Sequence, residues 1–165
     1  MTPAPIPADD RQRLEALRAL LILDTSPEKR FDRVVEFAAQ EFGCPIVLVS
    51  LIDESRQWFK ARSGLDVCET PRDVSFCGHA IVSDDLFIVP DACQDSRFAD
   101  NPLVTGAPFI RFYAGAPLRL DSGFRVGTLC LIDTRPREFD DVDQAILASL
   151  RDLVAQELAQ LKATT

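Results

Sequence analysis

The chain has 165 residues, of which 47% are hydrophobic and 27% charged, as in an ordinary globular protein with one core. Its net charge of −8 argues against nucleic-acid binding, because that function needs a basic surface. The sequence has no apolar run near the roughly 20 residues of a membrane span, and Met1–Asp10 lacks the pattern of a signal peptide. We therefore expect a cytoplasmic protein.

Two amphipathic helices are predicted after a flexible leader over residues 1–8. Asp9 and Asp10 can cap the first helix, which is expected to run to about Leu23 with four leucines on one face. These are Leu14, Leu17, Leu20 and Leu21. Thr25 and Glu28 fit a capping box that starts the second helix, whose apolar residues recur at helical spacing.

Short strands and loops are predicted for the middle of the chain. The run 46–52 is nearly all apolar and predicts a central strand. The run 57–62 mixes polar and apolar residues, as a half-exposed antiparallel strand does. We expect a loop over 63–75, a short helix over 78–82 and a strand over 86–89.

The last third of the chain predicts a loop, a hairpin and a helix. The segment 93–108 is rich in turn-forming residues and is expected to be a functional or mobile loop. Strand-like runs over 110–120 and 124–132 flank an Asp-Ser-Gly turn, and an amphipathic helix follows over 140–161. Consecutive hairpins require a mainly antiparallel sheet, so the fold class is α+β, with a single domain over 9–163.

The five cysteines stand at long, irregular intervals. They are Cys44, Cys68, Cys77, Cys93 and Cys130. Their number is odd and their spacing includes no Cys-x-x-Cys, so neither a zinc ribbon nor a thioredoxin-type pair is indicated. We expect no metal site, because a single histidine supplies too few nitrogen ligands. Cys44 and Cys130 lie within or beside apolar strands and are expected to be inert.

The most informative stretch is Ser75-Phe76-Cys77-Gly78-His79-Ala80-Ile81, which carries the one histidine and a cysteine in an apolar setting. A thiolate beside a protonated imidazole becomes nucleophilic. The predicted helix places Cys77 and His79 on roughly opposite faces, which disfavours direct pairing. The alternative is a buried cysteine and a histidine that binds backbone or lines a pocket.

Further candidates for ligand contact lie near the long loop. The Arg111 guanidinium suits a carboxylate or phosphate, although an ion pair with Asp91 or Asp100 is the alternative. Tyr113 offers a hydroxyl on an apolar ring. Asp91 itself follows a strand and is alternatively a turn cap.

Two residues of the long loop and two of the second strand complete the candidates. Arg97 and Asn101 are expected in a loop that serves as the lid of a pocket. Trp58 and Phe59 alternate along their strand, so only one of them faces inward, and the sequence leaves open which one.

Motifs of one protein family occur in order along residues 9–160. They are Ile22-Leu23-Asp24-Thr25, Phe31-Asp32, Val49-Ser50-Leu51-Ile52-Asp53, Gln57-Trp58-Phe59-Lys60, Glu69-Thr70-Pro71-Arg72, Ser75-Phe76-Cys77, His79-Ala80-Ile81, Val89-Pro90-Asp91-Ala92, Arg97-Phe98, Asn101-Pro102, Arg111-Phe112-Tyr113-Ala114-Gly115-Ala116-Pro117 and Gly127-Thr128-Leu129-Cys130. With them the chain resembles a GAF domain, the small-molecule-sensing module of signalling proteins. It is most similar to the bacterial type that precedes diguanylate cyclase or sensor histidine kinase domains.

The resemblance implies a six-stranded antiparallel sheet with the terminal helices packed on one face, and with loops and short helices forming a pocket on the other. Segments from about 58–113 would wall this pocket. The ligand-binding candidates are Trp58, Ser75, Cys77, His79, Asp91, Arg97, Asn101, Arg111 and Tyr113. The resemblance also implies a homodimer through the terminal helices and an output kinase or cyclase domain or partner, while it leaves the ligand and any cofactor open.

The chain departs from three specialised branches of this family. Cyclic-nucleotide-binding members carry Asn-Lys…Phe…Asp-Glu, of which only Phe139 and Asp143 find a match. Bilin-binding members have Cys followed directly by His, whereas Gly78 intervenes here. Reductases of free methionine sulfoxide share a Cys-Gly that Cys77-Gly78 resembles, but a later cysteine has no counterpart.

We therefore expect a non-catalytic sensory module that binds a small molecule and signals through its terminal helices by a population shift. One alternative is a thiol-based reductase that uses Cys77 with Cys68 or Cys93. The other is a purely structural dimerisation module.

Overall fold

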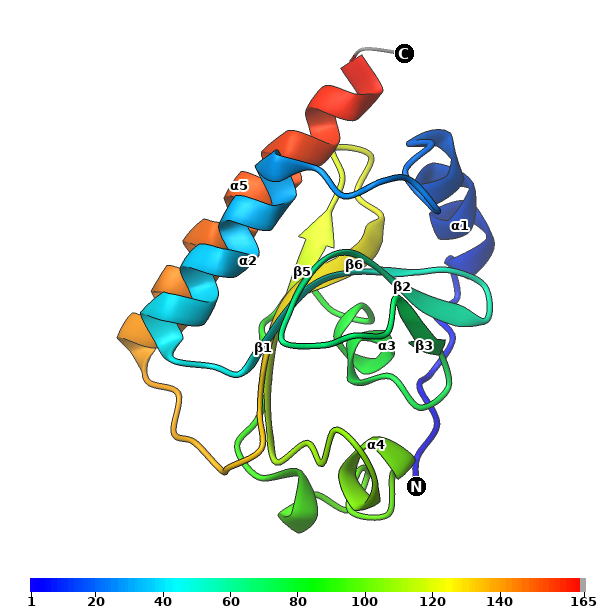
Figure 1. Cartoon of the computed structure of the whole chain (residues 1–165). Helices are drawn as coiled ribbons and strands as arrows, with labels where there is room; N and C mark the ends of the chain where they lie inside the picture. Colours follow the sequence, from blue (N-terminus) through cyan, green and yellow to red (C-terminus); the bar gives the residue numbers. More distant parts are fainter. Residues whose placement is uncertain (164–165) are drawn as a thin grey trace.

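A six-stranded antiparallel sheet in the order β3-β2-β1-β6-β5-β4 is the centre of the computed structural model, which describes residues 1–163 (Figure 1). The strands are β1 (Ile46–Ile52), β2 (Arg56–Ser63), β3 (Glu69–Pro71), β4 (Phe87–Val89), β5 (Phe112–Arg119) and β6 (Arg125–Asp133). The helices are α1 (Asp10–Ala19), α2 (Lys29–Phe42), α3 (Phe76–Ala80), α4 (Pro102–Thr105) and α5 (Asp141–Ala163), with a 3-10 turn η1 (Ala92–Gln94). The predicted α+β class and the six-stranded sheet are confirmed.

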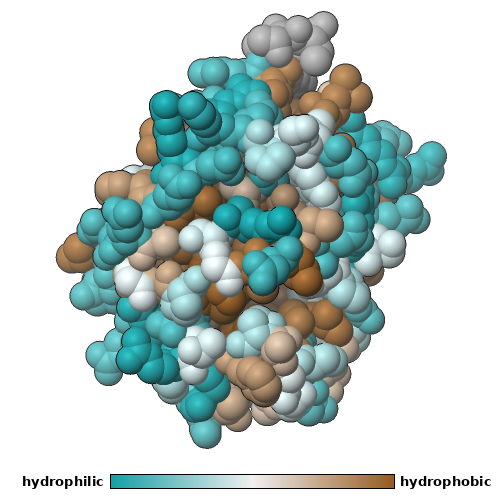
Figure 2. All heavy atoms as spheres, in the orientation of Figure 1, coloured by the Kyte–Doolittle hydropathy of each residue, from teal (hydrophilic) through white to brown (hydrophobic). Residues whose placement is uncertain are grey.

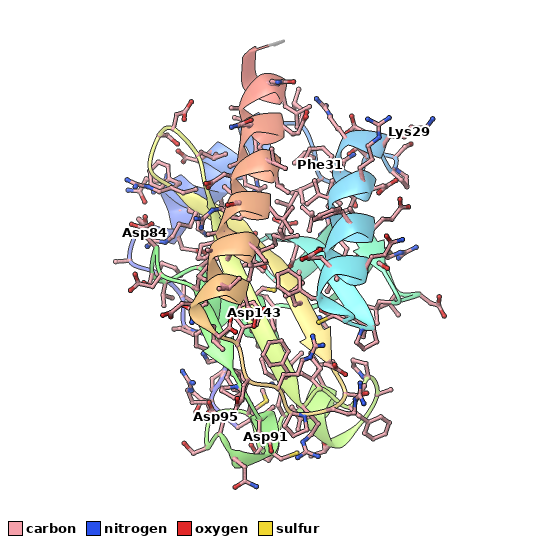
Figure 3. All side chains as sticks on the ribbon, turned by 90° about the vertical axis from the view of Figure 1, so that its left-hand side faces the viewer. Lys29, Phe31, Asp84, Asp91, Asp95 and Asp143 are labelled. Atoms are coloured by element: carbon pink, nitrogen blue, oxygen red, sulfur yellow. The ribbon has the colours of Figure 1, made fainter. Side chains whose placement is uncertain are left out.

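Long helices cover one face of the sheet. Figures 1 and 3 show α2 and α5 side by side and running in opposite directions across it. Phe31 of α2 and Leu147 of α5 are fully buried there, together with Leu17 of α1. We call this packing the helical core. Each such side chain contributes about 1.5–3 kcal/mol to folding through removal of its apolar surface from water.

The opposite face carries a second, smaller core. Successive strand residues point to opposite faces, so Leu48 of β1 lies here while its neighbours Val47 and Val49 belong to the helical core. This second core is covered by α3, α4 and the loops around them, with Phe76 and Phe98 stacked at 4.0 Å between ring centroids. Among the described helices, none is both long and apolar enough to cross a membrane.

The first helix is shorter than predicted. It ends at Ala19 rather than near Leu23, and Leu21 adopts a positive φ of 55°. Our placement of Leu21 on the buried helical face is wrong, because its side chain is 72% exposed while Leu20 and Ile22 are buried. Leaving the helix lets the chain turn both of these flanking residues into the core.

The capping box predicted at the second helix does not form. Thr25 and Glu28 instead bind Lys60, whose ammonium lies 2.7 Å from the Thr25 hydroxyl and 2.7 Å from the Glu28 carboxylate. The Lys60 side chain is fully buried and also donates to the Ser26 carbonyl oxygen. It is the extra residue of a β-bulge, since Val49 faces Ala61 and the next residue of β1 already faces Phe59.

Two short elements replace parts of the predicted loops. β3 pairs with β2 at the edge of the sheet, and its three residues are too few to show an alternating pattern. Asn101 is the N-cap of α4, since its side chain accepts a hydrogen bond from the Leu103 amide, and Pro102 is the first residue of the helix. An Asn-Pro pair is a recognised helix start, so α4 was detectable in the sequence.

The first eight residues, for which we expected a flexible leader, lie along the loops of the second core. The Thr2 amide donates to the Arg97 carbonyl oxygen, and the Ala4 amide donates to that of Asp73. The terminal amine lies 2.6 Å from the Asp100 carboxylate, and Ala4 is buried. The segment therefore has defined partners in this structure.

A matched pair of phenylalanines on α2 tests the helical core. Phe31→Ala should lower the free energy of unfolding by about 3–5 kcal/mol, because it leaves a cavity under α2. Phe37→Ala should change it by no more than about 0.5 kcal/mol, because Phe37 is 53% exposed. Urea denaturation measures both, and equal losses would contradict the assignment of the two faces.

Candidate functional site

An apolar cavity of about 240 Å³ lies between the second core face of the sheet and the loops that cover it. The sheet wall consists of Ile46, Leu48, Phe59, Tyr113 and Ile132. The loop wall consists of Leu65, Val67, Phe76, Leu103, Ala107, Pro108 and Ile110. Three polar side chains, those of Gln57, Thr70 and Cys77, complete the lining, and we refer to this space as the apolar cavity.

Figure 2 shows apolar surface on one outer face of the molecule. Hydrophobic side chains gather in the middle of the face that carries β2 and α3, framed by hydrophilic ones. The lining that the structure describes carries no charged side chain. A compact, mainly apolar and neutral molecule therefore matches the cavity better than an anion or a cation does.

Cys77 of α3 lines the cavity, and its sulfur has several hydrogen-bond partners. The Tyr113 hydroxyl lies 3.0 Å from it and the Thr128 hydroxyl 3.1 Å from it. The Cys130 sulfur lies 3.7 Å away. All four side chains are buried, and we call them the thiol cluster.

A row of hydrogen bonds links side chains of β1, β2 and β3 near the thiol cluster. The Ser50 hydroxyl donates to Gln57 Oε1 at 2.8 Å, and Gln57 Nε2 donates to the Thr70 hydroxyl at 2.8 Å. Gln57 and Thr70 both line the apolar cavity. A ligand with one polar group can therefore exchange hydrogen bonds with Gln57 or Thr70.

The thiol cluster separates the acidities of its two cysteines. Burial alone would raise the pKa of Cys77, but hydrogen bonds from Cys130, Thr128 and Tyr113 outweigh it and lower the pKa to about 7. Burial raises the pKa of Cys130 well above its usual value, and the neighbouring Cys77 raises it further. Away from the cluster, burial raises the pKa of Cys44 to about 11.

Of the nine predicted site residues, Cys77 and Tyr113 line the apolar cavity. Ser75 is buried behind them and caps α3, since its hydroxyl oxygen accepts from the Gly78 amide. α3 begins two residues earlier than predicted. In this helix the Cys77 side chain contacts the sheet at Tyr113 and Thr128.

His79 points away from Cys77. Its Nε2 lies 3.2 Å from the Thr2 carbonyl oxygen, and its ring meets the Phe98 ring edge-on. Burial lowers the pKa of His79. The prediction that these two residues do not pair agrees with their separate partners.

The charged candidates make ion pairs within the loops. Arg111 binds Asp91 through two hydrogen bonds of 2.8 and 2.9 Å, which is the alternative left open by the sequence. Arg97 binds Asp95 in the same manner. In Figure 3, Asp91 and Asp95 lie at the end of the molecule away from the C-terminal end of α5. The Asn101 side chain caps α4 by accepting a hydrogen bond from the Leu103 amide, and its Nδ2 donates to the Val74 carbonyl oxygen.

The second strand resolves the choice between its two aromatic residues. Phe59 lines the apolar cavity, whereas Trp58 belongs to the helical core. Sequence reasoning missed Gln57 as a cavity residue and Thr128 and Cys130 as members of the thiol cluster. The last two stand two positions apart on a predicted strand, so their common face was readable from the sequence.

The structure also changes the pairing of the cysteines. The predicted alternative partners of Cys77, which are Cys68 and Cys93, are exposed, whereas Cys130 is its neighbour in the core. Within the described residues, no three His, Cys, Asp or Glu side chains are grouped closely enough to hold a metal ion.

Comparison with known proteins identifies relatives of the whole domain. A family model described as GAF domain matches residues 26–158. A Pseudomonas aeruginosa protein named cyclic di-GMP phosphodiesterase is 41% identical over 165 residues, which cover 99% of this chain and 28% of that relative. The chain thus spans little more than a quarter of the curated relative that it matches.

Solved structures share the fold at low sequence identity. The GAF domain of an Acinetobacter phosphoenolpyruvate-protein phosphotransferase has a TM-score of 0.66 and 18% identity, covering 93% of this chain and 96% of that one. Free methionine-R-sulfoxide reductase from Neisseria meningitidis, solved with its substrate, has a TM-score of 0.66 and 17% identity, covering 99% of each chain. The Thermosynechococcus elongatus PixJ GAF domain has a TM-score of 0.66 and 16% identity, covering 92% and 91%.

The hydrogen bonds of the thiol cluster should set the pH at which Cys77 ionises. Thr128→Val removes one hydrogen bond to the thiolate and should raise the Cys77 pKa above its value of about 7. Thr105→Val, on α4, should leave it unchanged. The ultraviolet absorbance of the thiolate, followed against pH and corrected with Cys77→Ser, measures the midpoint. An unchanged midpoint in Thr128→Val would contradict the role of the hydroxyl.

Proposed function

The chain belongs to the GAF domain family, and on that premise we propose that it is a sensory and regulatory module that binds a small apolar molecule. The observation that carries this proposal is the apolar cavity in one face of a sheet whose other face holds α2 and α5. In this role the domain is non-catalytic, works in the cytoplasm and changes the state of an output domain or partner.

The size and lining of the apolar cavity define the ligand class. Small-molecule sites usually measure about 300–1,000 Å³, and a volume of about 240 Å³ fits a compact molecule. Gln57, Thr70 and Cys77 carry the polar groups that such a molecule would meet. We propose a neutral aromatic or aliphatic ligand with one hydrogen-bonding group.

The strands supply a route from the ligand to the terminal helices. Ile132 of β6 lines the cavity, while the adjacent Leu131 packs in the helical core. A ligand that moves the cavity wall therefore changes the packing under α2 and α5, and it favours one of two helix arrangements. Leu153 of α5 is 50% exposed and Phe37 of α2 is 53% exposed, and we propose that these helices pair with those of a second subunit.

The relative from Pseudomonas aeruginosa supports a place in cyclic di-GMP signalling. Because 99% of this chain matches that phosphodiesterase at 41% identity, we propose that the domain regulates a longer protein of cyclic di-GMP turnover. The dinucleotide itself carries two anionic phosphates, which the uncharged lining does not complement. In this proposal, a region outside this chain binds and hydrolyses it.

A tryptophan that fills the apolar cavity tests the ligand site. Small neutral alcohols such as benzyl alcohol and hexanol should raise the thermal unfolding midpoint of the wild-type protein, because they bind only the folded state. Leu103→Trp should abolish this rise by occupying the cavity. Leu153→Trp, on the outer side of α5, should retain it. Equal shifts in the two variants would contradict binding in the cavity.

A second test concerns cyclic di-GMP. Calorimetric titration of this chain with cyclic di-GMP should show no saturable binding, because the cavity offers no cationic partner for the phosphates. The same titration with benzyl alcohol is the positive control. Saturable binding of the dinucleotide would overturn our separation of the sensing site from the turnover site.

A further inference from the structure

The two cysteines of the thiol cluster lie in unequal positions. Cys77 lines the apolar cavity, whereas Cys130 lies behind it and is completely buried in β6. Both are free thiols with sulfurs 3.7 Å apart. A shift of less than 2 Å brings two such sulfurs to the roughly 2.05 Å of a disulfide bond.

The neighbours of Cys77 prepare it to act as the attacking thiolate. The Tyr113 and Thr128 hydroxyls converge on its sulfur at 3.0 and 3.1 Å, a geometry that stabilises negative charge there. Its low pKa and the raised pKa of Cys130 agree with this division. A thiolate attacks and a neighbouring thiol then resolves the product.

The lining of the cavity selects the kind of oxidant that reaches Cys77. Cys77 shares the lining of this cavity with apolar side chains of the loop wall, such as Leu103 and Ile110. A charged oxidant would lose its hydration there without finding a partner. An organic hydroperoxide has an apolar body for the cavity and a peroxide group small enough to meet the sulfur.

We propose that Cys77 and Cys130 form a redox pair that reacts with organic hydroperoxides. The Cys77 sulfur attacks the outer peroxide oxygen, an S–O bond forms, and the O–O bond breaks. The proton that Cys77 released on ionising returns to the departing oxygen, so the hydroperoxide leaves as an alcohol and Cys77 becomes a sulfenic acid. The Cys130 thiol then displaces water to give a disulfide, so that two thiols lose two electrons and one peroxide is reduced.

A disulfide between Cys77 and Cys130 would add a covalent signal to reversible ligand binding at the same cavity. The disulfide would tie α3 to the centre of β6, next to Ile132 on the cavity wall. A dithiol would restore the two cysteines. The pair differs from the exposed Cys68 and Cys93, which serve as internal controls for unselective oxidation.

The first experiment uses the wild-type protein and two probes. Native protein is treated with cumene hydroperoxide or with hydrogen peroxide, free thiols are alkylated after denaturation, and peptides are mapped without reduction. A Cys77–Cys130 disulfide should form faster than Cys44 is oxidised, because two hydroxyls within 3.1 Å of the Cys77 sulfur stabilise its thiolate, whereas burial raises the pKa of Cys44. Cumene hydroperoxide should be the faster probe.

Three variants divide the reaction into its steps. Cys130→Ser should stop at a sulfenic acid on Cys77, which dimedone traps as a covalent adduct. Cys77→Ser should leave Cys130 as a thiol, and Cys93→Ser should form the disulfide as the wild-type protein does. If Cys77→Ser does not fold, the wild-type map and the Cys130→Ser adduct still decide.

Several results would overturn the proposal. Oxidation confined to Cys68 and Cys93 would remove the redox pair, and equal rates with the two probes would remove the assignment to organic hydroperoxides. Binding of benzyl alcohol is measured separately. Its persistence without disulfide formation would sink this inference and leave the proposed sensory function standing, whereas disulfide formation without alcohol binding would do the reverse.

Discussion

The sheet of this protein must bury both of its faces, and the two cores and the cavity follow from that requirement. All seven residues of β1 are buried, because both faces of the sheet are covered. The helices α2 and α5 cover one face, and short elements cover the other. Long helices pack closely against a sheet. The short helices α3 and α4 and their loops leave a space of about 240 Å³ above the second face. This incompletely packed side of the sheet is where we propose that a ligand binds.

Much of the fold was readable from the sequence because its strongest signals are periodic. The apolar spacing of α2 and the continuous run of β1 each demand one kind of element, and both were predicted within a few residues. β3 escaped detection because three residues carry no period. α1 was drawn too long because Leu21 fits the helical spacing, although a turn at that point buries its neighbours instead.

The site was less predictable than the fold, since side-chain partners depend on contacts between distant segments. Cys77 and Tyr113 were identified from their types and settings and do line the cavity. Arg111 also looked suited to a ligand, but Asp91, far from it in sequence, occupies its guanidinium. Cys130 was taken as inert because its strand is apolar. Only the packing of β6 under α3 brings its sulfur to Cys77.

Lys60 joins the cavity to the start of the helical layer. It follows Phe59 directly in β2, so one peptide unit separates a cavity wall from a buried ammonium that binds Thr25, Ser26 and Glu28. The ammonium holds the connection that leads into α2. A displacement of Phe59 would therefore also shift Lys60 at the bulge, and through its hydrogen bonds it would shift the segment that leads into α2.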